Sequence, residues 1–179
     1  MSVGLIVIDI QNDYFQNGKM ELEGSEDAGQ AAGRLLNFCR EYKLPVFHIQ
    51  HIAIRPGATF FLPNSAGVEI HRSVKPLDEE TVIQKHFPNS FRETGLLQHL
   101  QRKNIQQLVV AGMMTHMCVD STTRAARDLG YQPIVIADAT ATKNLEFQEK
   151  EVSAQQVQIS FLSALQNFAQ IQATHTFLW

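Results

Sequence analysis

Residues 108–137 have the sequence LVVAGMMTHMCVDSTTRAARDLGYQPIVIA, in which two apolar runs flank a helical pattern. Leu108–Ala111 and Ile134–Ala137 are short apolar runs of the kind that form buried parallel strands. Between them, Cys118–Leu129 has helical periodicity, and Gly130 is placed to end that helix. The stretch therefore predicts two parallel strands joined by a crossover helix.

The same alternation of strand and helix patterns continues in both directions from this stretch. Because alternating elements of this kind build a parallel sheet covered on both faces, we predict an α/β protein with a three-layer, Rossmann-like fold and a mostly parallel sheet flanked by helices. The further strand patterns are Val3–Ile8, Val46–Ile49 and, more weakly, Thr81–Gln84 and Ile171–Thr174; the further helix patterns are Ser25–Tyr42, Gly95–Lys103 and Glu149–Phe168.

Length and composition limit the classes of function. A chain of 179 residues with 44% hydrophobic residues suits one buried core, so we expect a single domain over residues 1–179. A net charge of -3, without a basic stripe, points to a small-molecule substrate or a protein partner and away from nucleic acid or a membrane. The N-terminal apolar run ends at Asp9, too early for a secretory signal, and the two cysteines suggest no disulfide framework. We expect a cytoplasmic protein with free thiols.

Reactive side chains follow four of the predicted strands. Asp9 ends the first, His51 follows the second, Lys85 follows the third, and residues 112–118 follow Leu108–Ala111. Ligands of open parallel sheets bind beyond the carboxyl ends of the strands, so these groups should meet at one edge. An acid, an imidazole, an amine and a thiol would then share one site.

These groups suit nucleophilic catalysis by Cys118. A helix N-terminus favours a thiolate over a thiol, Asp9 could accept and return a proton, and Lys85 could stabilise the charges. Backbone N–H groups of GMMTHMC lie near the sulfur in the sequence and suit an oxyanion hole. Each residue taken alone has a structural alternative: cysteines are commonly buried, and Asp9 could cap a turn. Their joint placement at strand ends favours the catalytic interpretation.

Two further segments concern the pocket. Residues Ala53–Glu80 form a long stretch without clear periodicity, which suggests a lid or an oligomer contact. Within it, Phe60 and Phe61 either wall the substrate pocket or anchor the loop, and the sequence favours neither. His48 and His51 are three residues apart on a strand, so their rings should lie on opposite faces. We therefore expect no shared metal, with His51 alone lining the pocket.

Three motifs in this order resemble those of the isochorismatase-like cysteine hydrolases, a family that includes nicotinamidases and N-carbamoylsarcosine amidase. They are LIVIDIQNDY at residues 5–14, QKHFPNSFRETGLLQHL at residues 84–100 and VVAGMMTHMCVDSTTRAARDLGY at residues 109–131; DATAT at residues 138–142 is similar to a further signature. Together they span nearly the whole chain.

The resemblance implies a catalytic triad of Asp9, Lys85 and Cys118. It also implies a cis peptide bond between Met113 and Met114, an oxyanion hole formed by the amides of Met114 and Cys118, no cofactor, and a homodimer or homotetramer. The segment 53–80 and the last helix are the candidate contacts. Gln11, Phe15 and Thr115 stand within or beside these motifs and are further substrate-pocket candidates.

The sequence departs from the family pattern in three informative places. The presence of Cys118 argues against isochorismatase activity proper, and HIQHIAIRPG replaces the D-W-H-like metal segment of nicotinamidases. Gln158 stands where the family often has a histidine. We therefore predict a cysteine hydrolase that cleaves a carbon–nitrogen bond, an amide or carbamoyl bond, through a thioester, without a metal. The alternatives are an inactive ligand-binding or partner-binding protein of the same fold and a metal-dependent nicotinamidase.

Overall fold

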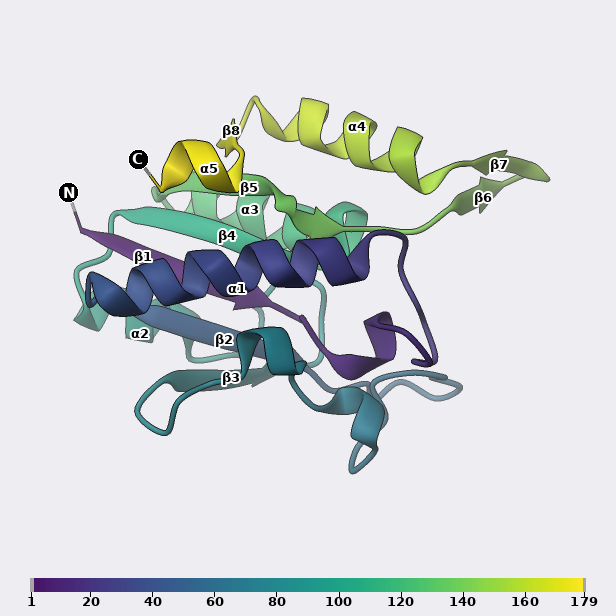
Figure 1. Cartoon of the computed structure of the whole chain (residues 1–179), viewed down its shortest axis with the longest axis horizontal. Coiled ribbons are helices and arrows are strands. Elements are labelled where there is room, and N and C mark those ends of the chain that lie inside the picture. The colour runs from purple at the N-terminus through teal and green to yellow at the C-terminus, as the bar shows by residue number, and fades with distance from the viewer. Residues whose placement is uncertain (1, 179) are drawn as a thin grey trace.

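Six parallel strands form the central sheet of the computed structural model, which describes residues 2–178. Their spatial order is β3-β2-β1-β4-β5-β8 (Figure 1). The chain starts at the centre of the sheet, builds outward to β3, and returns across β1 to build the other half. The strands are β1 (Val3–Ile8), β2 (Val46–His51), β3 (Thr81–Lys85), β4 (Gln107–Met113), β5 (Gln132–Ala141) and β8 (Gln170–Gln172).

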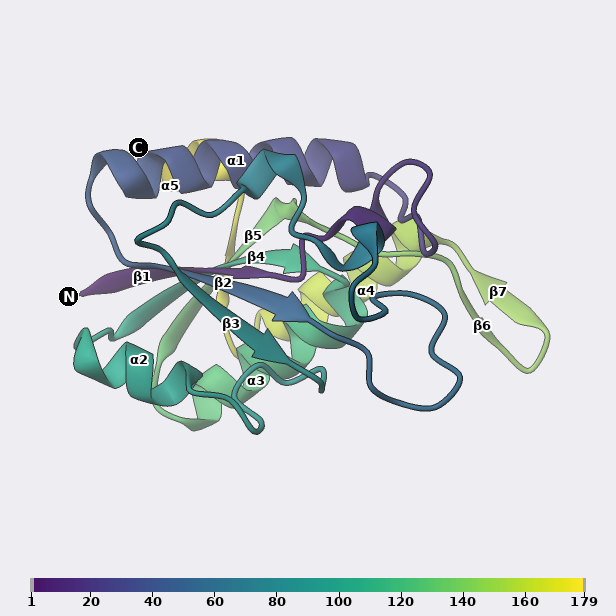
Figure 2. The same ribbon diagram turned by 90° about the horizontal axis from the view of Figure 1, so that it is seen from below.

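Helices cover both faces of this sheet, which confirms the predicted three-layer α/β fold (Figure 2). One face packs against α1 (Ser25–Glu41) and α5 (Thr174–Phe177). The other packs against α2 (Leu96–Arg102), α3 (Asp120–Asp128) and α4 (Ala154–Leu165). Within residues 2–178, no helix is long and apolar enough to cross a membrane. Short helical turns occur at Asn12–Tyr14, Ala66–Val68, Arg72–Val74 and Thr115–Val119.

The core explains why β1 has an almost uninterrupted apolar sequence. Leu5 and Val7 point into the cluster shared with α1, whereas Ile6 and Ile8 point into the cluster shared with α2, α3 and α4. Because both faces of β1 are buried, alternation of polar and apolar residues would have cost stability. The strand therefore holds the residue that follows it, Asp9, in a fully buried position.

The predicted helix Glu149–Phe168 is shorter than expected. Its first residues belong to a hairpin of β6 (Leu145–Phe147) and β7 (Lys150–Val152), which projects from the body of the molecule (Figures 1 and 2). Gln148 and Glu149 form the turn with φ of 49° and 63°, a left-handed conformation typical of tight hairpins. Side chains that favour helices occupy this segment, so the sequence pattern did not indicate the turn. The capping box formed by Ser153 and Gln156 marks the observed start of α4.

Candidate active site

Strand pairing places the four predicted groups at one edge of the sheet. Ile8 pairs with Ile49 on one side and with Gly112 on the other, so Asp9 emerges between β2 and β4. One strand farther out, His51 pairs with Lys85. Gly112 has φ of 147°, and a Cβ atom there would clash with the carbonyl oxygen of Ile8, so only glycine fits at this position beside β1.

Asp9 and Lys85 form a buried ion pair. Lys85 Nζ lies 2.8 Å from Asp9 Oδ2, and both side chains are fully inaccessible to solvent. Burial alone would lower the pKa of Lys85, but the charge of Asp9 and the nearby Cys118 outweigh it and raise that pKa. The ammonium group therefore stays charged. Asp9 also has φ of 50°, a left-handed conformation that non-glycine residues adopt mainly where surrounding structure enforces it.

Cys118 lies next to this pair. Its Sγ atom is 3.1 Å from Lys85 Nζ, and potential ligand atoms of Asp9, His51 and Cys118 all lie within 4.8 Å of one another. Burial first, and then the charge of Asp9, raise the pKa of Cys118, while Lys85 lowers it and is outweighed. The resting residue is therefore a thiol, which is opposite to the expectation from sequence. The expectation placed Cys118 at the N-terminus of a helix, but it lies in the π-helical turn Thr115–Val119, and α3 begins only at Asp120. Burial and the charge of Asp9 therefore determine the protonation of its sulfur.

His51 is held neutral beside the ion pair. Burial lowers its pKa from 6.5 to about 4, with Asp9 opposing and Lys85 reinforcing the shift. Its Nδ1 atom lies 3.0 Å from Lys85 Nζ. A charged lysine can only donate there, so the neutral ring carries its proton on Nε2. His51 thus presents a hydrogen-bond donor as well as an apolar ring edge to the pocket that it lines.

The cluster of Asp9, His51 and Cys118 has the residue types of a metal site, but its centre holds a cation already. Lys85 Nζ lies 2.8 Å from Asp9 Oδ2, 3.0 Å from His51 Nδ1 and 3.1 Å from Cys118 Sγ. A metal ion between these three atoms would meet the ammonium group at close range and would need to displace it. The donor set therefore fits Lys85 better than it fits a metal.

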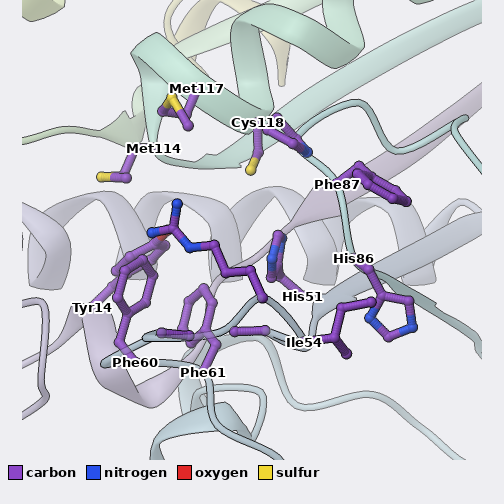
Figure 3. A pocket seen from close by; sticks show the side chains of 14 residues that line it. Tyr14, His51, Ile54, Phe60, Phe61, His86, Phe87, Met114, Met117 and Cys118 are labelled. Atoms are coloured by element: carbon purple, nitrogen blue, oxygen red, sulfur yellow. The ribbon is translucent and has the colours of Figure 1, made fainter.

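A cavity of about 440 Å³ opens beside Cys118. Figure 3 shows Met114, Met117 and Cys118 on one side of it, with Tyr14, Phe60 and Phe61 on the opposite side. Predicted pocket residues His51, Phe60 and Phe61 all line the cavity. Tyr14 and Phe61 have ring centroids 4.6 Å apart, and those of Phe60 and Phe61 are 5.0 Å apart, so the rings form one aromatic wall. Phe61 is also buried, and its backbone N–H donates to Asp13, so it both walls the pocket and anchors the segment 53–80.

Three other pocket candidates lie outside the lining of this cavity, which corrects the expectation for them. Gln11 is buried, and its side-chain amide forms hydrogen bonds with the backbone of His51 and Val68. Phe15 stacks on the ring of His71, with centroids 3.5 Å apart. Thr115 is fully buried, and its hydroxyl donates to Gln158 at 2.7 Å, with a backbone carbonyl oxygen farther away at 3.2 Å. Position in the sequence alone could not distinguish residues that line the cavity from residues that pack or bond behind its lining.

The loop that follows β4 has the backbone that the sequence resemblance implies. The peptide bond between Met113 and Met114 is cis, and both Met114 and Cys118 line the cavity. Gln158 of α4 holds this loop to β5, because it accepts from the Thr115 hydroxyl at 2.7 Å and donates to the Thr140 hydroxyl at 2.7 Å. Gln158 therefore takes a structural position directly behind the loop that carries Cys118.

Sequence reasoning missed Tyr14, Asp13 and Arg55. Tyr14 lines the cavity, and burial raises the pKa of its phenol well above the usual value, so it stays neutral. Asp13 Oδ2 accepts from the backbone N–H of Phe61 at 2.6 Å and so positions the aromatic wall. Arg55 also lines the cavity. The D-x-Q-x-D spacing was a signal for Asp13, but nothing in the long segment singled out Arg55.

The chain is similar to known proteins over its whole length. The sequence profile of the family described as Isochorismatase domain matches residues 3–173. An uncharacterized isochorismatase family protein of Bacillus subtilis (strain 168), YddQ, is 50% identical over 179 residues, with 99% of each chain covered.

A crystal structure from Oleispira antarctica, provisionally assigned to the isochorismatase hydrolases, superposes with a TM-score of 0.95 at 43% identity, covering 99% of this chain and 96% of that one. A streptothricin hydrolase of Streptomyces noursei is 31% identical over 141 residues, covering 79% of this chain and 50% of that protein. The order of motifs, the parallel sheet and these matches agree with one another. The chain therefore belongs to the isochorismatase family of hydrolases.

Proposed function

We propose that this protein is a cysteine hydrolase that cleaves a carbon–nitrogen bond, either an amide or a carbamoyl bond, of a small molecule through a thioester. The observation that carries the proposal is the contact of Lys85 Nζ with both Asp9, at 2.8 Å, and Cys118 Sγ, at 3.1 Å, at the wall of an apolar cavity. A buried acid, cation and thiol in one cluster have the functional pattern of an activated nucleophile.

The first half of the reaction forms the thioester. Cys118 Sγ attacks the substrate carbonyl carbon while its proton passes to Asp9, whose Oδ1 atom has no hydrogen-bond partner within residues 2–178. The negative oxygen of the tetrahedral intermediate is stabilised by backbone N–H groups of Met114 and Cys118. The carbon–nitrogen bond then breaks as Asp9 returns the proton to the leaving nitrogen, which departs as ammonia or an amine.

The second half restores the enzyme. Asp9, again a carboxylate, takes a proton from a water molecule as the water oxygen attacks the thioester carbon. Breakage of the carbon–sulfur bond releases the acid, and the proton held by Asp9 returns to the Cys118 sulfur. Because Lys85 stays charged throughout, it offsets the charge of Asp9 and of the developing thiolate. The net reaction consumes one water for each bond that is cleaved, and it requires no cofactor.

Three features support this activity. Cys118 provides the nucleophile that amide cleavage through a thioester needs, and the chain is similar to a protein named streptothricin hydrolase. The cavity of about 440 Å³ lies within the range of small-molecule sites. These features support an amidohydrolase and leave its substrate to be found by screening.

The direct test is release of ammonia or amine from a panel of small amides, ureas and N-carbamoyl compounds. Wild type should turn over at least one compound, and Cys118→Ala should lower kcat/KM by more than about 10³-fold, while circular dichroism stays unchanged. Turnover that persists in Cys118→Ala would require a different nucleophile. Wild-type binding without turnover across the panel would instead favour a ligand-binding protein, and turnover of nicotinamide that chelation abolishes would favour a metal-dependent nicotinamidase.

A further inference from the structure

We propose that Arg55 is a specificity-determining residue that binds an anionic group of the substrate, chemically a carboxylate or its equivalent. The preferred substrate would then be an anionic amide or carbamoyl compound with an apolar body. This inference rests on the proposed function, because it assigns the charge and shape of the molecule that Cys118 attacks.

The lining of the cavity supplies the first argument. Of its 14 residues, Arg55 is the sole permanently charged one, and nine of the others are alanine, isoleucine, phenylalanine, proline or methionine residues. An isolated guanidinium group in an apolar lining gives the pocket one strong polar anchor and surfaces for an apolar body. The remaining polar groups are Tyr14, His51, His86 and Cys118, of which His51 is neutral because burial lowers its pKa to about 4.

Charge balance supplies the second argument. The Asp9 and Lys85 charges neutralise each other in a contact of 2.8 Å, so they leave no net charge at the floor of the site. Within the part of the chain that the structure describes, Arg55 forms no ion pair and no side-chain hydrogen bond. Its charge reaches the reaction centre, because it contributes to the lowered pKa of His51. The pocket is therefore electropositive and lacks its counterion.

Position along the chain supplies the third argument. Arg55 follows His51, the last residue of β2, by four positions, so a short segment ties it to the strand that borders Asp9. Arg55 is an exposed residue whereas Cys118 is 5% exposed, and both line the cavity, so the cavity joins a solvent-accessible cation to a buried sulfur. A substrate with its amide at the sulfur and its anionic group at the solvent side would contact both residues.

Arg55 also suits a clean experiment. Because it makes no side-chain hydrogen bond or ion pair within residues 2–178, replacement should leave the fold intact. The chain offers a matched control in Arg92, whose guanidinium group lies 3.7 Å above the ring of Phe87, a residue of the pocket lining, without itself lining the cavity. Arg92→Met removes the same charge and size from the neighbourhood of the pocket, but not from its interior.

The experiment compares two alkylating reagents of nearly equal shape, iodoacetate and iodoacetamide, which differ in charge. The rate at which each reagent modifies Cys118 is measured by peptide mass. The iodoacetate rate is divided by the iodoacetamide rate, and this ratio is then divided by the same ratio for N-acetylcysteine. Wild type should favour iodoacetate, and Arg55→Met should lower this normalised ratio by about fivefold to tenfold, as expected for loss of one charge-assisted contact. Arg55→Lys should keep most of the preference, and Arg92→Met should match wild type.

An equal normalised ratio in wild type and Arg55→Met would overturn the inference. If neither reagent modifies Cys118, the proposed nucleophile is in doubt, and a second measurement decides the anion site by itself. Calorimetry would then compare benzoate with benzyl alcohol, two ligands of similar size and different charge, in wild type and Arg55→Met. Preferential benzoate binding that weakens at least fivefold in Arg55→Met supports the site, whereas no preference or no change contradicts it.

Discussion

Lys85 is the residue on which the site depends. Its ammonium group has four neighbouring acceptors: Asp9 Oδ2, His51 Nδ1, the carbonyl oxygen of Phe87 and Cys118 Sγ, at distances of 2.8 to 3.1 Å. An ammonium group has only three N–H donors, so one of these four acceptors receives no hydrogen bond of its own from Lys85. The sulfur is the weakest acceptor of the four, which agrees with a resting thiol and with the proposed role of Lys85, stabilisation of the thiolate during attack.

Removal of Lys85 should destabilise the protein strongly. Lys85→Met leaves the carboxylate of Asp9 buried without its counterion, and breaking a buried pair in this way typically costs about 3–5 kcal/mol. Urea denaturation measures the loss. The double variant Asp9→Asn/Lys85→Met should recover part of it, since no charge is then left unpaired. A double variant less stable than Lys85→Met would show that the charge of Asp9 is not the source of the instability.

His51 should make stability depend on pH. Its pKa is about 4 in the folded protein against 6.5 for an unperturbed histidine, so the unfolded chain binds more protons between these values. Stability is therefore complete above about pH 6.5 and is lost as pH falls toward about 4, by up to roughly 3 kcal/mol from this residue. His51→Gln should show a smaller loss over the same window in denaturation experiments. A wild-type slope unchanged by the substitution would assign the effect to other histidines.

At the scale of elements, Gln11 and Asp13 connect β1 to the long segment between β2 and β3. Gln11 bonds the backbone of His51 and Val68, at 2.7 to 2.9 Å. Asp13 accepts from the backbone N–H groups of Phe61 and Lys19, at 2.6 and 3.1 Å. The motif that ends β1 thus supplies Asp9, the proposed proton acceptor, first, and then two side chains that fix the opposite wall of the pocket.

Asp13→Ala should loosen this wall. Phe61 has φ of 54°, a conformation that the hydrogen bond from its N–H to Asp13 helps to hold. We expect a loss of about 1–3 kcal/mol in stability, faster hydrogen exchange at the Phe61 amide, and reduced turnover. The matched control is Asn12→Ala, which removes an exposed contact to the carbonyl of Ala66 from the adjacent position. Equal exchange in both variants would contradict the role of Asp13.

At the scale of the whole molecule, assembly stays a prediction. We propose a dimer or tetramer, and exposed apolar side chains suggest where copies would meet. Phe147 on the projecting hairpin is 75% exposed, and Ile159 on α4 is 60% exposed. Sedimentation at several concentrations should give a stable oligomer that Phe147→Ser or Ile159→Ser weakens. A monomer at all concentrations would contradict the proposal.

The sequence was sufficient for the fold because each central strand is an apolar run and helical periodicity separates most of them. It was also sufficient to predict that Asp9, Lys85 and Cys118 lie close together, because the carboxyl ends of parallel strands meet at one edge of the sheet. It was insufficient wherever tertiary surroundings decide. Burial sets the protonation of Cys118, and the turn at Gln148 competes with helix-forming neighbours. The segment 53–80 places Arg55 in the pocket through contacts that no local pattern encodes.

The most direct test of Cys118 as nucleophile is to trap the thioester. An amide found by the ammonia-release screen is mixed with enzyme, quenched in acid during turnover, and the peptide that carries Cys118 is weighed. We expect a mass increase equal to the acyl group on Cys118, removable by hydroxylamine and absent in Asp9→Asn. Full turnover with no adduct on Cys118, at a rate that Cys118→Ala leaves unchanged, would contradict it.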